Sequence, residues 1–324
     1  MSSKKLLYLS RSDVESVALD IETIISLLEE AFRLKGQGLV EMPPKPGIHT
    51  KPDAFIHAMP AYIPKLKSAG IKWVSGYPEN YKHGLPYISG LILLNDVETG
   101  LPYVAMDCTW ITAYRTGAAT ALSAKYLARP DSQTIGILAC GVQGRTNLEA
   151  LASLFKIKRV YAYDISGEAQ RKYVKEMSGK LGIEIIGVDE PRDAVVKSEI
   201  VVTSGPILKN PTPTIGRDWL QPGGFASAVD FDSYWKPEAL LQFDKISTDD
   251  HAQFKYYKSI GYFCATPDPY ADLGEIVNGI KPGRERGDER TMAMNLGLAL
   301  EDMAVAPEIY RRAVEKGVGT WVEL

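Results

Sequence analysis

The sequence predicts an α/β protein in which a Rossmann-type, doubly wound parallel sheet accompanies a discontinuous α+β domain. Two observations predict the parallel sheet: strand-like and helical segments alternate after Arg129-Pro130, and a glycine turn joins the first of these strands to a helix. A third observation, the turn-punctuated β segments of residues 38–107, predicts an antiparallel or mixed sheet. The chain of 324 residues is long enough for about two domains. We place them at 1–128, completed by 300–324, and at 129–299.

The first domain is expected to begin with a strand at 6–9 and a helix that Ser10 or Ser12 caps. Apolar residues recur on one face of that helix until Gly36 and Gly38 end it (Ile21, Ile24, Ile25, Leu28, Ala31 and Phe32). Strands are expected within 55–62, 69–77, 88–96 and 101–107, with a hairpin turn at 98–100. An alanine-rich helix at 109–129 follows.

The second domain is expected to hold the parallel strands, separated by helices, at 134–140, 159–164, 183–188, 199–204, 224–230 and 244–249. Residues 290–304 are largely apolar and are expected to form a helix, with a second helix at 307–316. Because these helices are too apolar to be free in solvent, we expect them to return to the first domain.

The glycine turn has the spacing of a phosphate-binding site. Residues 134–138 form a short apolar run of the kind that makes a buried parallel strand, and Ala139-x-Gly141-x-x-Gly144 follows. Gly141 would let the backbone approach a pyrophosphate, and Gly144 would let helix and strand close up. The helix N-terminus would offer unpaired N–H groups to the anion.

The next strand ends in Asp164, about 20 residues beyond the turn, where an acid accepts hydrogen bonds from an adenosine ribose. This context favours a dinucleotide site over an ordinary α/β turn with an acid at a strand end. A carboxylate there would repel a ribose 2′-phosphate, so NAD is favoured over NADP. The expected cofactor-binding residues are Gly141, Val142, Gln143, Gly144, Asp164, Ser204 and Val229.

Composition argues against several classes of function. The net charge of −3 comes with no basic stripe, so a nucleic-acid partner is not expected. The N-terminal MSSKKLLYLS has too short an apolar run for a signal peptide, and no apolar segment reaches the roughly 18 residues of a membrane span. Three widely spaced cysteines indicate reduced thiols in a cytoplasmic protein, and neither they nor the histidines show metal-ligand spacing. We expect no metal and no membrane partner.

Three cations, Lys45, Lys72 and Arg115, lie on segments that are otherwise apolar or rich in glycine. Lys72, for example, stands between Ile71 and Trp73. Cations so placed either pair with internal acids or hold an anionic substrate. The residues alone leave both alternatives open.

Short motifs run in order along nearly the whole chain: Met42-Pro43-Pro44-Lys45, Met59-Pro60, Gly70-Ile71-Lys72-Trp73-Val74, Leu94-Asn95-Asp96-Val97-Glu98-Thr99-Gly100, Tyr114-Arg115-Thr116-Gly117-Ala118 and Gly297-Leu298-Ala299-Leu300-Glu301-Asp302. In these motifs the chain resembles the ornithine cyclodeaminase/mu-crystallin family, which also contains alanine dehydrogenases and ketimine reductases. The resemblance implies a homodimer whose first domain supplies the dimer contacts and the substrate site. It also implies that Lys72 and Arg115 hold the α-carboxylate of an amino acid, with Lys45 at a position where the family often has arginine.

The resemblance further implies a catalytic aspartate after the strand at 224–230, and two acids compete for that role. An ungapped match of Ala228-Val229 and Lys236-Pro237-Glu238 to the family pattern assigns the role to Asp232. Asp230 then either shares this role or is a solvated strand-end acid or a helix cap. Asp230-Phe231 and Tyr234-Trp235 depart from the small pair and the Pro-Gly of the family. They add bulk and a charge beside the nicotinamide, so cofactor pose and substrate size are expected to differ.

A further departure is His57, at the position where ornithine-cyclising members carry a glutamate for the distal amine. An imidazole is a poor partner for an ammonium and suits a small amino acid or a cyclic imino acid. We therefore expect hydride transfer between nicotinamide C4 and substrate Cα, with Asp232 as general acid/base and Lys72 as a second catalytic residue that, with Arg115 and Lys45, orients the substrate. The alternatives are cyclodeamination of L-ornithine to L-proline and ammonia with NAD recycled, and a non-catalytic nucleotide or ligand binder like the crystallin members.

Overall fold

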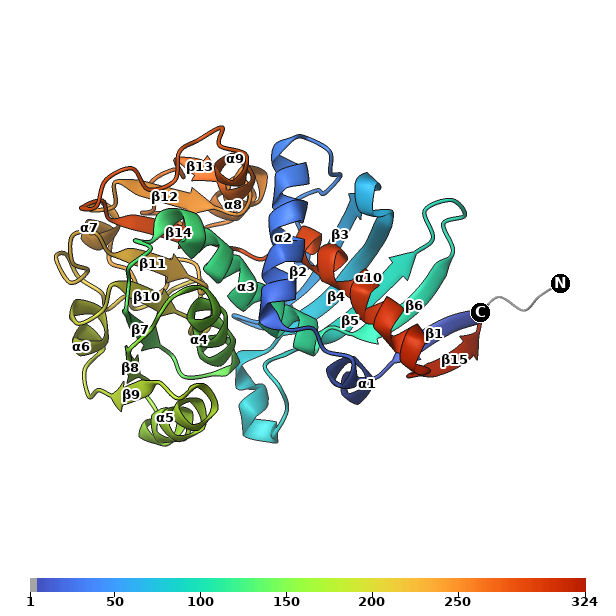
Figure 1. Cartoon of the computed structure of the whole chain (residues 1–324), viewed down its shortest axis with the longest axis horizontal. Coiled ribbons are helices and arrows are strands. Elements are labelled where there is room, and N and C mark those ends of the chain that lie inside the picture. The colour runs from blue at the N-terminus through green and yellow to red at the C-terminus, as the bar shows by residue number, and fades with distance from the viewer. Residues whose placement is uncertain (1–4) are drawn as a thin grey trace. The chain divides into compact units, whose positions relative to one another are not determined.

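The structure is a computed structural model that describes residues 5–324, and the chain clusters in two compact units (Figure 1). Unit 1 comprises the chain up to Arg115 together with Gly297–Leu324, and unit 2 comprises Thr116–Leu296. The expected α/β class, with a parallel sheet and a discontinuous α+β part, is confirmed. The first residues of MSSKKLLYLS, in which we expect no signal peptide, lie outside the described part of the chain. The functional assignment of the two units stays a prediction at this point.

Unit 1 is built on a seven-stranded mixed sheet in the order β15-β1-β6-β5-β4-β3-β2. Strands β3 to β6 pair antiparallel, as expected for consecutive hairpins, whereas β1 pairs with β6 in parallel. At the expected hairpin turn, the carboxylate of Asp96 accepts hydrogen bonds from the N–H and the hydroxyl of Thr99. The strands are β1 (Lys5–Leu9), β2 (Gly47–Ile48), β3 (Phe55–Ile63), β4 (Ser68–Gly76), β5 (Ile88–Asn95), β6 (Pro102–Asp107) and β15 (Thr320–Glu323).

One face of this sheet is covered by helices. Helix α10 (Ala299–Lys316) packs against α2 (Ile21–Gly36), β3 and β4 (Figure 1). Alternate residues of β4, Ser68, Lys72 and Val74, are buried on the side of α10. Trp73 points to the opposite face and is 46% exposed. The remaining elements of this part of the chain are α1 (Arg11–Ser16), the 3₁₀ turns η1 (Pro64–Leu66) and η2 (Pro78–His83), and α3 (Thr109–Leu127), which continues into unit 2.

The expected single helix after β1 is two helices. Ser10 caps the short α1, where its hydroxyl accepts from the N–H of Asp13 and the Asp13 carboxylate accepts from the N–H of Ser10. The apolar stripe belongs to α2, whose cap is Asp20, with a carboxylate that accepts from the N–H of Thr23 at 2.7 Å. A second capping residue inside the stretch therefore divides it.

The expected helix at 290–304 is wrong. Residues 291–294 form strand β14 (Thr291–Met294) of unit 2, and the helix begins only at Ala299. A short apolar run buried on both faces of a sheet has no period that separates it from a buried helix. The expected second helix at 307–316 is part of α10, which continues through Pro307. Pro307 has no N–H to donate to the carbonyl of Met303, and the hydroxyl of Ser68 donates to that carbonyl instead at 2.7 Å.

Unit 2 contains an eight-stranded sheet in the order β13-β12-β14-β11-β10-β7-β8-β9, with every described pair parallel. The chain proceeds from β7 to β9 in one direction and from β10 in the other, which makes the border of β7 and β10 a topological switch point. The strands are β7 (Thr134–Leu138), β8 (Arg159–Tyr163), β9 (Glu184–Gly187), β10 (Ile200–Thr203), β11 (Phe225–Ala228), β12 (Lys245–Thr248), β13 (Ala271–Asp272) and β14. The helices are α4 (Val142–Leu154), α5 (Gly167–Leu181), α6 (Pro191–Val196), α7 (Pro237–Leu240), α8 (His251–Ser259) and α9 (Leu273–Val277). Within α4, Leu148 and Leu151 are buried, whereas Leu154 is 40% exposed.

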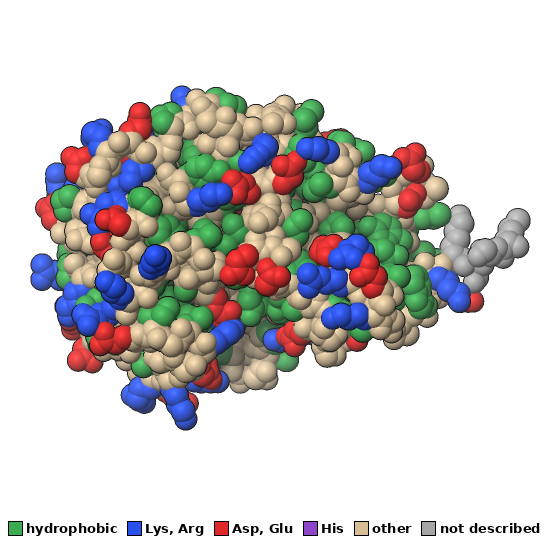
Figure 2. Space-filling view, viewed as in Figure 1, with side chains coloured by type: hydrophobic (Ala, Val, Ile, Leu, Met, Phe, Trp, Pro, Cys, Tyr) green, Lys and Arg blue, Asp and Glu red, His purple; other side chains and the backbone are tan. Residues whose placement is uncertain are grey.

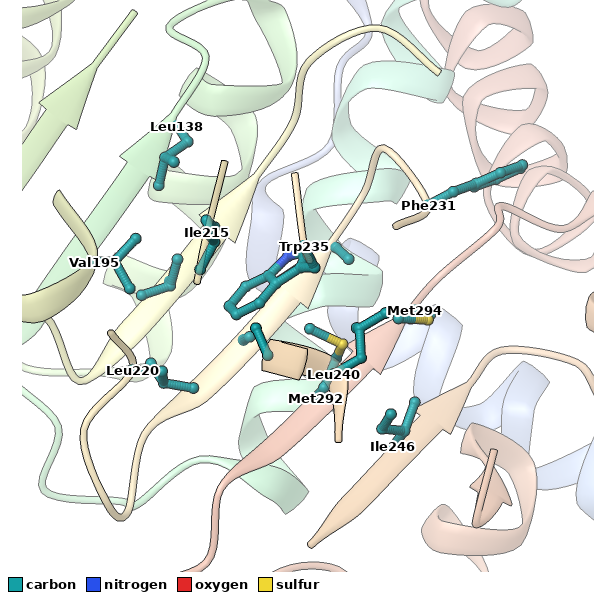
Figure 3. Close-up of a cluster of buried hydrophobic side chains, with 14 of the residues drawn as sticks. Leu138, Val195, Ile215, Leu220, Phe231, Trp235, Leu240, Ile246, Met292 and Met294 are labelled. Atoms are coloured by element: carbon teal, nitrogen blue, oxygen red, sulfur yellow. The ribbon is translucent and has the colours of Figure 1, made fainter. Parts of the chain in front are cut away.

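A large apolar core packs against one part of this sheet. Figure 3 shows Trp235 in the middle of the cluster, among Leu240, Met292 and Ile215. Trp235 is 3% exposed, and its indole N–H reaches the hydroxyl of Thr203 at 3.4 Å. The segment after β11 is therefore anchored in the core, which fixes the position of the two acids that it carries.

On the face drawn in Figure 2, basic and acidic side chains are interspersed. Among residues 5–324, no helix is both long and apolar enough to cross a membrane.

Candidate active site

The glycine turn between β7 and α4 has two glycines with opposite surroundings. A Cβ added to Gly144 would lie 2.5 Å from the carbonyl oxygen of Ala139 and 3.2 Å from Cγ2 of Ile137, so glycine is required for this close approach of helix and strand. A Cβ added to Gly141 would meet no described atom within 4 Å. Gly141 therefore leaves open space beside the N-terminus of α4, as a phosphate-binding turn needs.

Ala139 stands where the motif usually has its first glycine, and its backbone keeps the conformation that glycine favours. Its φ is +78°, in the left-handed region, which costs an alanine about 1 kcal/mol. Its N–H donates to the carbonyl of Tyr163 at 2.9 Å, and its carbonyl accepts from the hydroxyl of Ser204 at 3.2 Å. Residues at the ends of β8 and β10 therefore hold the strained turn from both sides.

The carboxylate of Asp164 is part of the same turn. Its Oδ2 accepts from the N–H of Cys140 at 2.7 Å, and its Oδ1 accepts from the N–H of Ser166 at 2.8 Å. These bonds fix the acid at the end of β8, beside the glycine turn. Each carboxylate oxygen keeps a second lone pair, so Asp164 can still accept from a ribose hydroxyl.

Arg145 belongs to this turn and is missed by the glycine pattern. Its guanidinium donates to the carbonyl of Gly141 at 3.0 Å and pairs with Glu176 at 2.8 Å. It also lies 5.3 Å from the ring centroid of Tyr173, whose hydroxyl donates to the carbonyl of Gly144 at 3.1 Å. Its place directly after Gly144 is the signal in the sequence that could have identified it as a brace of the turn.

The other expected cofactor residues lie along the same edge of the sheet. Gln143 is in the first turn of α4, Ser204 follows β10, and Val229 follows β11. Val142 is 62% exposed, and Ile165, just after β8, is 90% exposed, so two apolar side chains at this edge are outside the core. Because the edge includes the topological switch point, it is where open α/β sheets bind ligands.

The two acids after β11 have different surroundings. Asp230 is fully buried, so the alternative of a solvated strand-end acid or a helix cap is wrong, whereas a role shared with Asp232 stays a prediction. Its carboxylate accepts from the hydroxyl of Thr203 (2.7 Å) and the N–H of Gly205 (3.0 Å), and burial raises its pKa to about 7. Asp232 is partly exposed and accepts from the hydroxyl of Thr266 (2.8 Å), and burial raises its pKa above the usual range. Asp230 is therefore tied into the fold, and Asp232 is the more accessible acid.

Phe231 stands between the two acids in the sequence and has a left-handed backbone. Its φ of +64° is rare for a bulky residue, and its ring is buried among Tyr257, Tyr262 and Phe263. These edge-to-face and tilted ring contacts hold the strained backbone in place. The bulk that departs from the family pattern therefore serves as an anchor of the loop.

In unit 1, the expected cations Lys72 and Arg115 are paired with internal acids. Nζ of Lys72 lies 2.8 Å from Oδ1 and 2.6 Å from Oδ2 of Asp302. The side chains of Lys72 and Asp302, and those of Arg115 and Glu301, are at most 7% exposed. Arg115 pairs with Glu301 at 2.5 Å. Burial and the neighbouring Arg115 lower the pKa of Lys72, while Asp302 opposes them. Burial raises the pKa of Glu301, against the effect of Arg115.

Lys45 joins this group through Gly297. Its Nζ donates to the carbonyl of Gly297 at 2.9 Å, and a Cβ added to Gly297 would lie 2.7 Å from a guanidinium nitrogen of Arg115. Gly297 also has a φ of +78°, which favours glycine. We call Lys45, Lys72, Arg115, Glu301 and Asp302 the cation cluster: with three cations and two acids, the formal charges of these five side chains sum to +1 when all are ionised.

His57 lies on β3, and its buried ring stacks on Phe55 with centroids 4.2 Å apart. Burial lowers the pKa of His57 to about 2, and the charges of Lys45, His49 and Lys72 act in the same direction. The imidazole is therefore neutral at neutral pH.

One group in unit 2 could bring three metal-ligand atoms together. His251, Asp272 and Glu275 have such atoms within 4.8 Å of one another, which the spacing in the sequence does not indicate. Asp272 and Glu275 form the capping box at the start of α9, and His251 contacts Glu275 at 3.0 Å. The capping box accounts for the positions of the two acids, so we assign no metal to this group.

The chain matches one protein family over nearly its whole length. Residues 4–317 match the ornithine cyclodeaminase/mu-crystallin family. The chain is 35% identical to an alanine dehydrogenase of Archaeoglobus fulgidus, with 98% of each chain covered. The structure is similar to that of a Δ1-pyrroline-2-carboxylate reductase of Thermococcus litoralis in complex with NADH and L-proline (36% identity, TM-score 0.88, 97% of this chain and 99% of that one). It is equally similar to an archaeal alanine dehydrogenase dimer with bound NAD (33% identity, TM-score 0.88, 99% of both chains). The chain therefore belongs to the ornithine cyclodeaminase/mu-crystallin family.

Proposed function

We propose that this chain is an NAD-dependent oxidoreductase that acts on the C–N bond of a small amino acid or a cyclic imino acid. NAD, when bound, accepts or supplies a hydride at nicotinamide C4, and the partner atom is Cα of the substrate. The observation that carries the choice of substrate is the buried, neutral His57. The proposal agrees in class with the alanine dehydrogenase and the pyrroline-2-carboxylate reductase among the relatives.

The carboxyl edge of the unit 2 sheet fits a dinucleotide. The open space at Gly141 and the N–H groups at the start of α4 suit a pyrophosphate. The carboxylate of Asp164 suits ribose hydroxyls and would repel a 2′-phosphate, which favours NAD over NADP. Val142, Gln143, Ser204 and Val229 complete the proposed cofactor site. The two solved relatives hold NADH and NAD.

Lys72 and Arg115, together with Lys45, hold the substrate carboxylate in this proposal. The formal charge of +1 on the five side chains of the cation cluster attracts an anion, which suits the binding of a carboxylate there. The side chains are buried and already hydrogen-bonded, so little rotamer freedom is lost on binding. A carboxylate held in this way fixes the direction of Cα.

Asp232 is the proposed general acid/base. It gives a proton to, or takes one from, the substrate nitrogen or a water molecule that attacks the imine carbon. A raised pKa brings this proton exchange closer to neutral pH, where a general acid/base is most effective. Asp230 supports it indirectly, since its bonds to Thr203 and Gly205 hold the loop at the end of β11.

His57 favours a substrate without a distal ammonium. A neutral imidazole offers no charge to such a group, and Lys45 and Lys72 add positive potential around it. Alanine and cyclic imino acids carry no second ammonium. Ornithine and lysine carry one, so their cyclodeamination is the less favoured function.

A homodimer is the second part of the proposal. On the sheet face opposite α10, Trp73 lies between Ala58 and Leu91 in register, and Trp73 and Leu91 are 46% and 41% exposed. Ile71 and Leu93 form a neighbouring pair on the same face. An apolar sheet face of this kind is typical of a subunit interface. The archaeal alanine dehydrogenase, at 33% identity, is a dimer, and we propose that a second copy covers this face.

The test is a spectrophotometric assay of NADH with the purified chain. L-Alanine and other small amino acids are supplied with NAD, Δ1-pyrroline-2-carboxylate and related cyclic imines with NADH, and L-ornithine with a parallel assay for ammonia. A change in NADH with a small amino acid or an imine is the expected result. Ammonia and proline from ornithine at constant NADH would replace the proposal with cyclodeamination. Tight NADH binding without turnover of any of these compounds would leave a non-catalytic binder.

A further inference from the structure

Asp302 connects the two cations that are proposed to hold the substrate carboxylate. Both of its carboxylate oxygens contact Nζ of Lys72, at 2.8 and 2.6 Å, and Oδ1 lies 3.6 Å from Nε of Arg115. We propose that Asp302 is a positioning residue, which holds Lys72 and Arg115 at a fixed separation and keeps Lys72 charged for carboxylate binding. The inference rests on the proposed function and adds to it a residue with a stated role.

The start of α10 explains how the acid comes to be there. The helix begins at Ala299, so Glu301 and Asp302 lie in its first turn, where the helix dipole favours negative charge. Consecutive residues of a helix point about 100° apart, so the two acids reach different partners. Glu301 contacts Arg115, while Asp302 contacts Lys72 directly and Arg115 at a longer distance.

Lys72 needs a counter-ion to stay charged. It has no exposed surface, and an ammonium buried without a partner tends to lose its proton. Burial and Arg115 lower the pKa of Lys72, and Asp302 is the acid in direct contact that raises it. Besides Asp302, the charged or titratable groups that interact with Lys72 are Arg115 on α3, Cys108 just before α3, Glu301 on α10 and His57 on β3.

The formal charge of the cation cluster suits a site that receives an anion. Two cations with two acids would be neutral by themselves. Lys45 adds a third cation, and its Nζ donates at 2.9 Å to the carbonyl of Gly297, which lies in the loop that leads into α10. The resulting formal charge of +1 on these five side chains favours the binding of a carboxylate. Asp302 therefore sets both the geometry and the net charge of the cluster.

The experiment compares Asp302→Asn with the full-length wild type, and Glu289→Gln serves as the control. Glu289 is a 1% exposed acid that pairs with Lys245 at 3.5 Å in unit 2, so the control also removes a buried acid from an ion pair. Binding of pyrrole-2-carboxylate, a planar carboxylate, is measured by calorimetry from neutral to alkaline pH. Turnover of Δ1-pyrroline-2-carboxylate with NADH is measured over the same range.

Asp302→Asn is expected to weaken binding of pyrrole-2-carboxylate at neutral pH by about tenfold or more. The alkaline pH at which binding is lost should fall by at least about one unit, because the neutral amide no longer holds the proton on Lys72. KM for the imine should rise by a larger factor than kcat falls. Glu289→Gln should change the free energy of unfolding without changing the pH dependence of pyrrole-2-carboxylate binding. Asp302→Glu keeps the charge and alters the distance between the carboxylate and Lys72. It should weaken binding of pyrrole-2-carboxylate, while the alkaline limit, the pH at which binding is lost, should stay at its wild-type value.

A folded Asp302→Asn variant with the affinity and the alkaline limit of the wild type would overturn the inference. Tighter binding would also overturn it, since Asp302 would then compete with the ligand. If Asp302→Asn does not fold, the Asp302→Glu variant tests the inference instead. Wild-type affinity of that variant for pyrrole-2-carboxylate would contradict a positioning role for Asp302. A wild type that neither binds pyrrole-2-carboxylate nor converts any substrate of the panel overturns the proposed function itself, whatever the variants do.

Discussion

The glycines at 141 and 144 lie three residues apart in one turn and are predicted to serve different purposes. Alanine at position 141 would keep the backbone, since φ at Gly141 is −77° and the added Cβ meets no described atom within 4 Å. We expect Gly141→Ala to change the free energy of unfolding by less than about 1 kcal/mol. The methyl group would occupy the space where a pyrophosphate approaches the helix N-terminus. The loss of one charge-assisted hydrogen bond there costs about 1.5–3 kcal/mol, or roughly a tenfold to hundredfold weaker NADH affinity.

Alanine at position 144 is expected to act in the opposite way. Its Cβ would lie 2.5 Å from the carbonyl oxygen of Ala139, well inside van der Waals contact, and that oxygen belongs to the backbone of the same turn. Helix α4 must then move away from β7, which is expected to destabilise the chain by about 1–3 kcal/mol. Weaker NADH binding would accompany this loss as a consequence of the displaced turn.

Two measurements on the same preparations separate the effects. Urea unfolding without nucleotide reports stability, and a fluorescence titration with NADH reports affinity. The expected pattern is a stable Gly141→Ala that binds NADH weakly and an unstable Gly144→Ala. NADH affinity unchanged in Gly141→Ala would refute the placement of the pyrophosphate. Wild-type stability of Gly144→Ala would refute the close approach of α4 and β7.

Four further predictions concern the acids, His57 and the exposed sheet face. His57→Glu should raise turnover of L-ornithine, followed by ammonia release, by about tenfold or more because it supplies a carboxylate for the distal ammonium; no gain would count against the role given to His57. Asp232→Asn should lower kcat by about a hundredfold or more while NADH affinity stays within about twofold, and a kcat near that of the wild type would remove Asp232 from the chemistry. Leu91→Lys should turn a dimer into a monomer in analytical ultracentrifugation, and a persistent dimer would show that another face forms the interface. In the folded chain the pKa of Asp230 is raised from its usual 3.8 to about 7. Its neutral form therefore stabilises the fold fully below about pH 4, and this stabilisation is lost as the pH rises through 7. The free energy of unfolding should fall by about 4 kcal/mol in total over this range. Asp230→Asn should reduce this fall in urea midpoints between pH 4 and 8, and a fall parallel to that of the wild type would contradict the assignment.

Local patterns were sufficient to predict strand β1 and strands β3 to β12, whereas β2, β13, β14 and β15 were not predicted. The alternating runs of β3 to β6 and the short apolar runs of β7 to β12 were placed within about two residues of their observed ends. The errors have local causes as well. Asp20 is a cap inside a helical pattern, and β14 is an apolar strand with both faces buried, which has no alternation to separate it from a helix.

The meeting of the glycine turn and Asp164 at the carboxyl edge of the unit 2 sheet was also predictable. The turn at 139–144 and Asp164 are joined by one β-strand and one helix, so their meeting follows from the right-handed βαβ connection. The choice between Asp230 and Asp232 was not settled by residue types, since both follow β11 closely. It depends on the left-handed backbone of Phe231 and on distant partners such as Thr266, which no spacing shows.

The acidic partners of the cations in the cation cluster could not be predicted from the sequence. Buried cations require acids, so the sequence indicated that Lys72 and Arg115 had partners or a ligand, but the contact between Lys72 and Asp302 spans 230 residues. A helix drawn from residue 290 would have placed Glu301 and Asp302 near its C-terminal end, where carboxylates are disfavoured by the helix dipole. The observed start at Ala299 moves both acids into the first turn, where the dipole favours them and they meet the cations. The boundary of one helix therefore decides whether the two acids lie at a helix end that disfavours them or at a helix start beside Lys72 and Arg115.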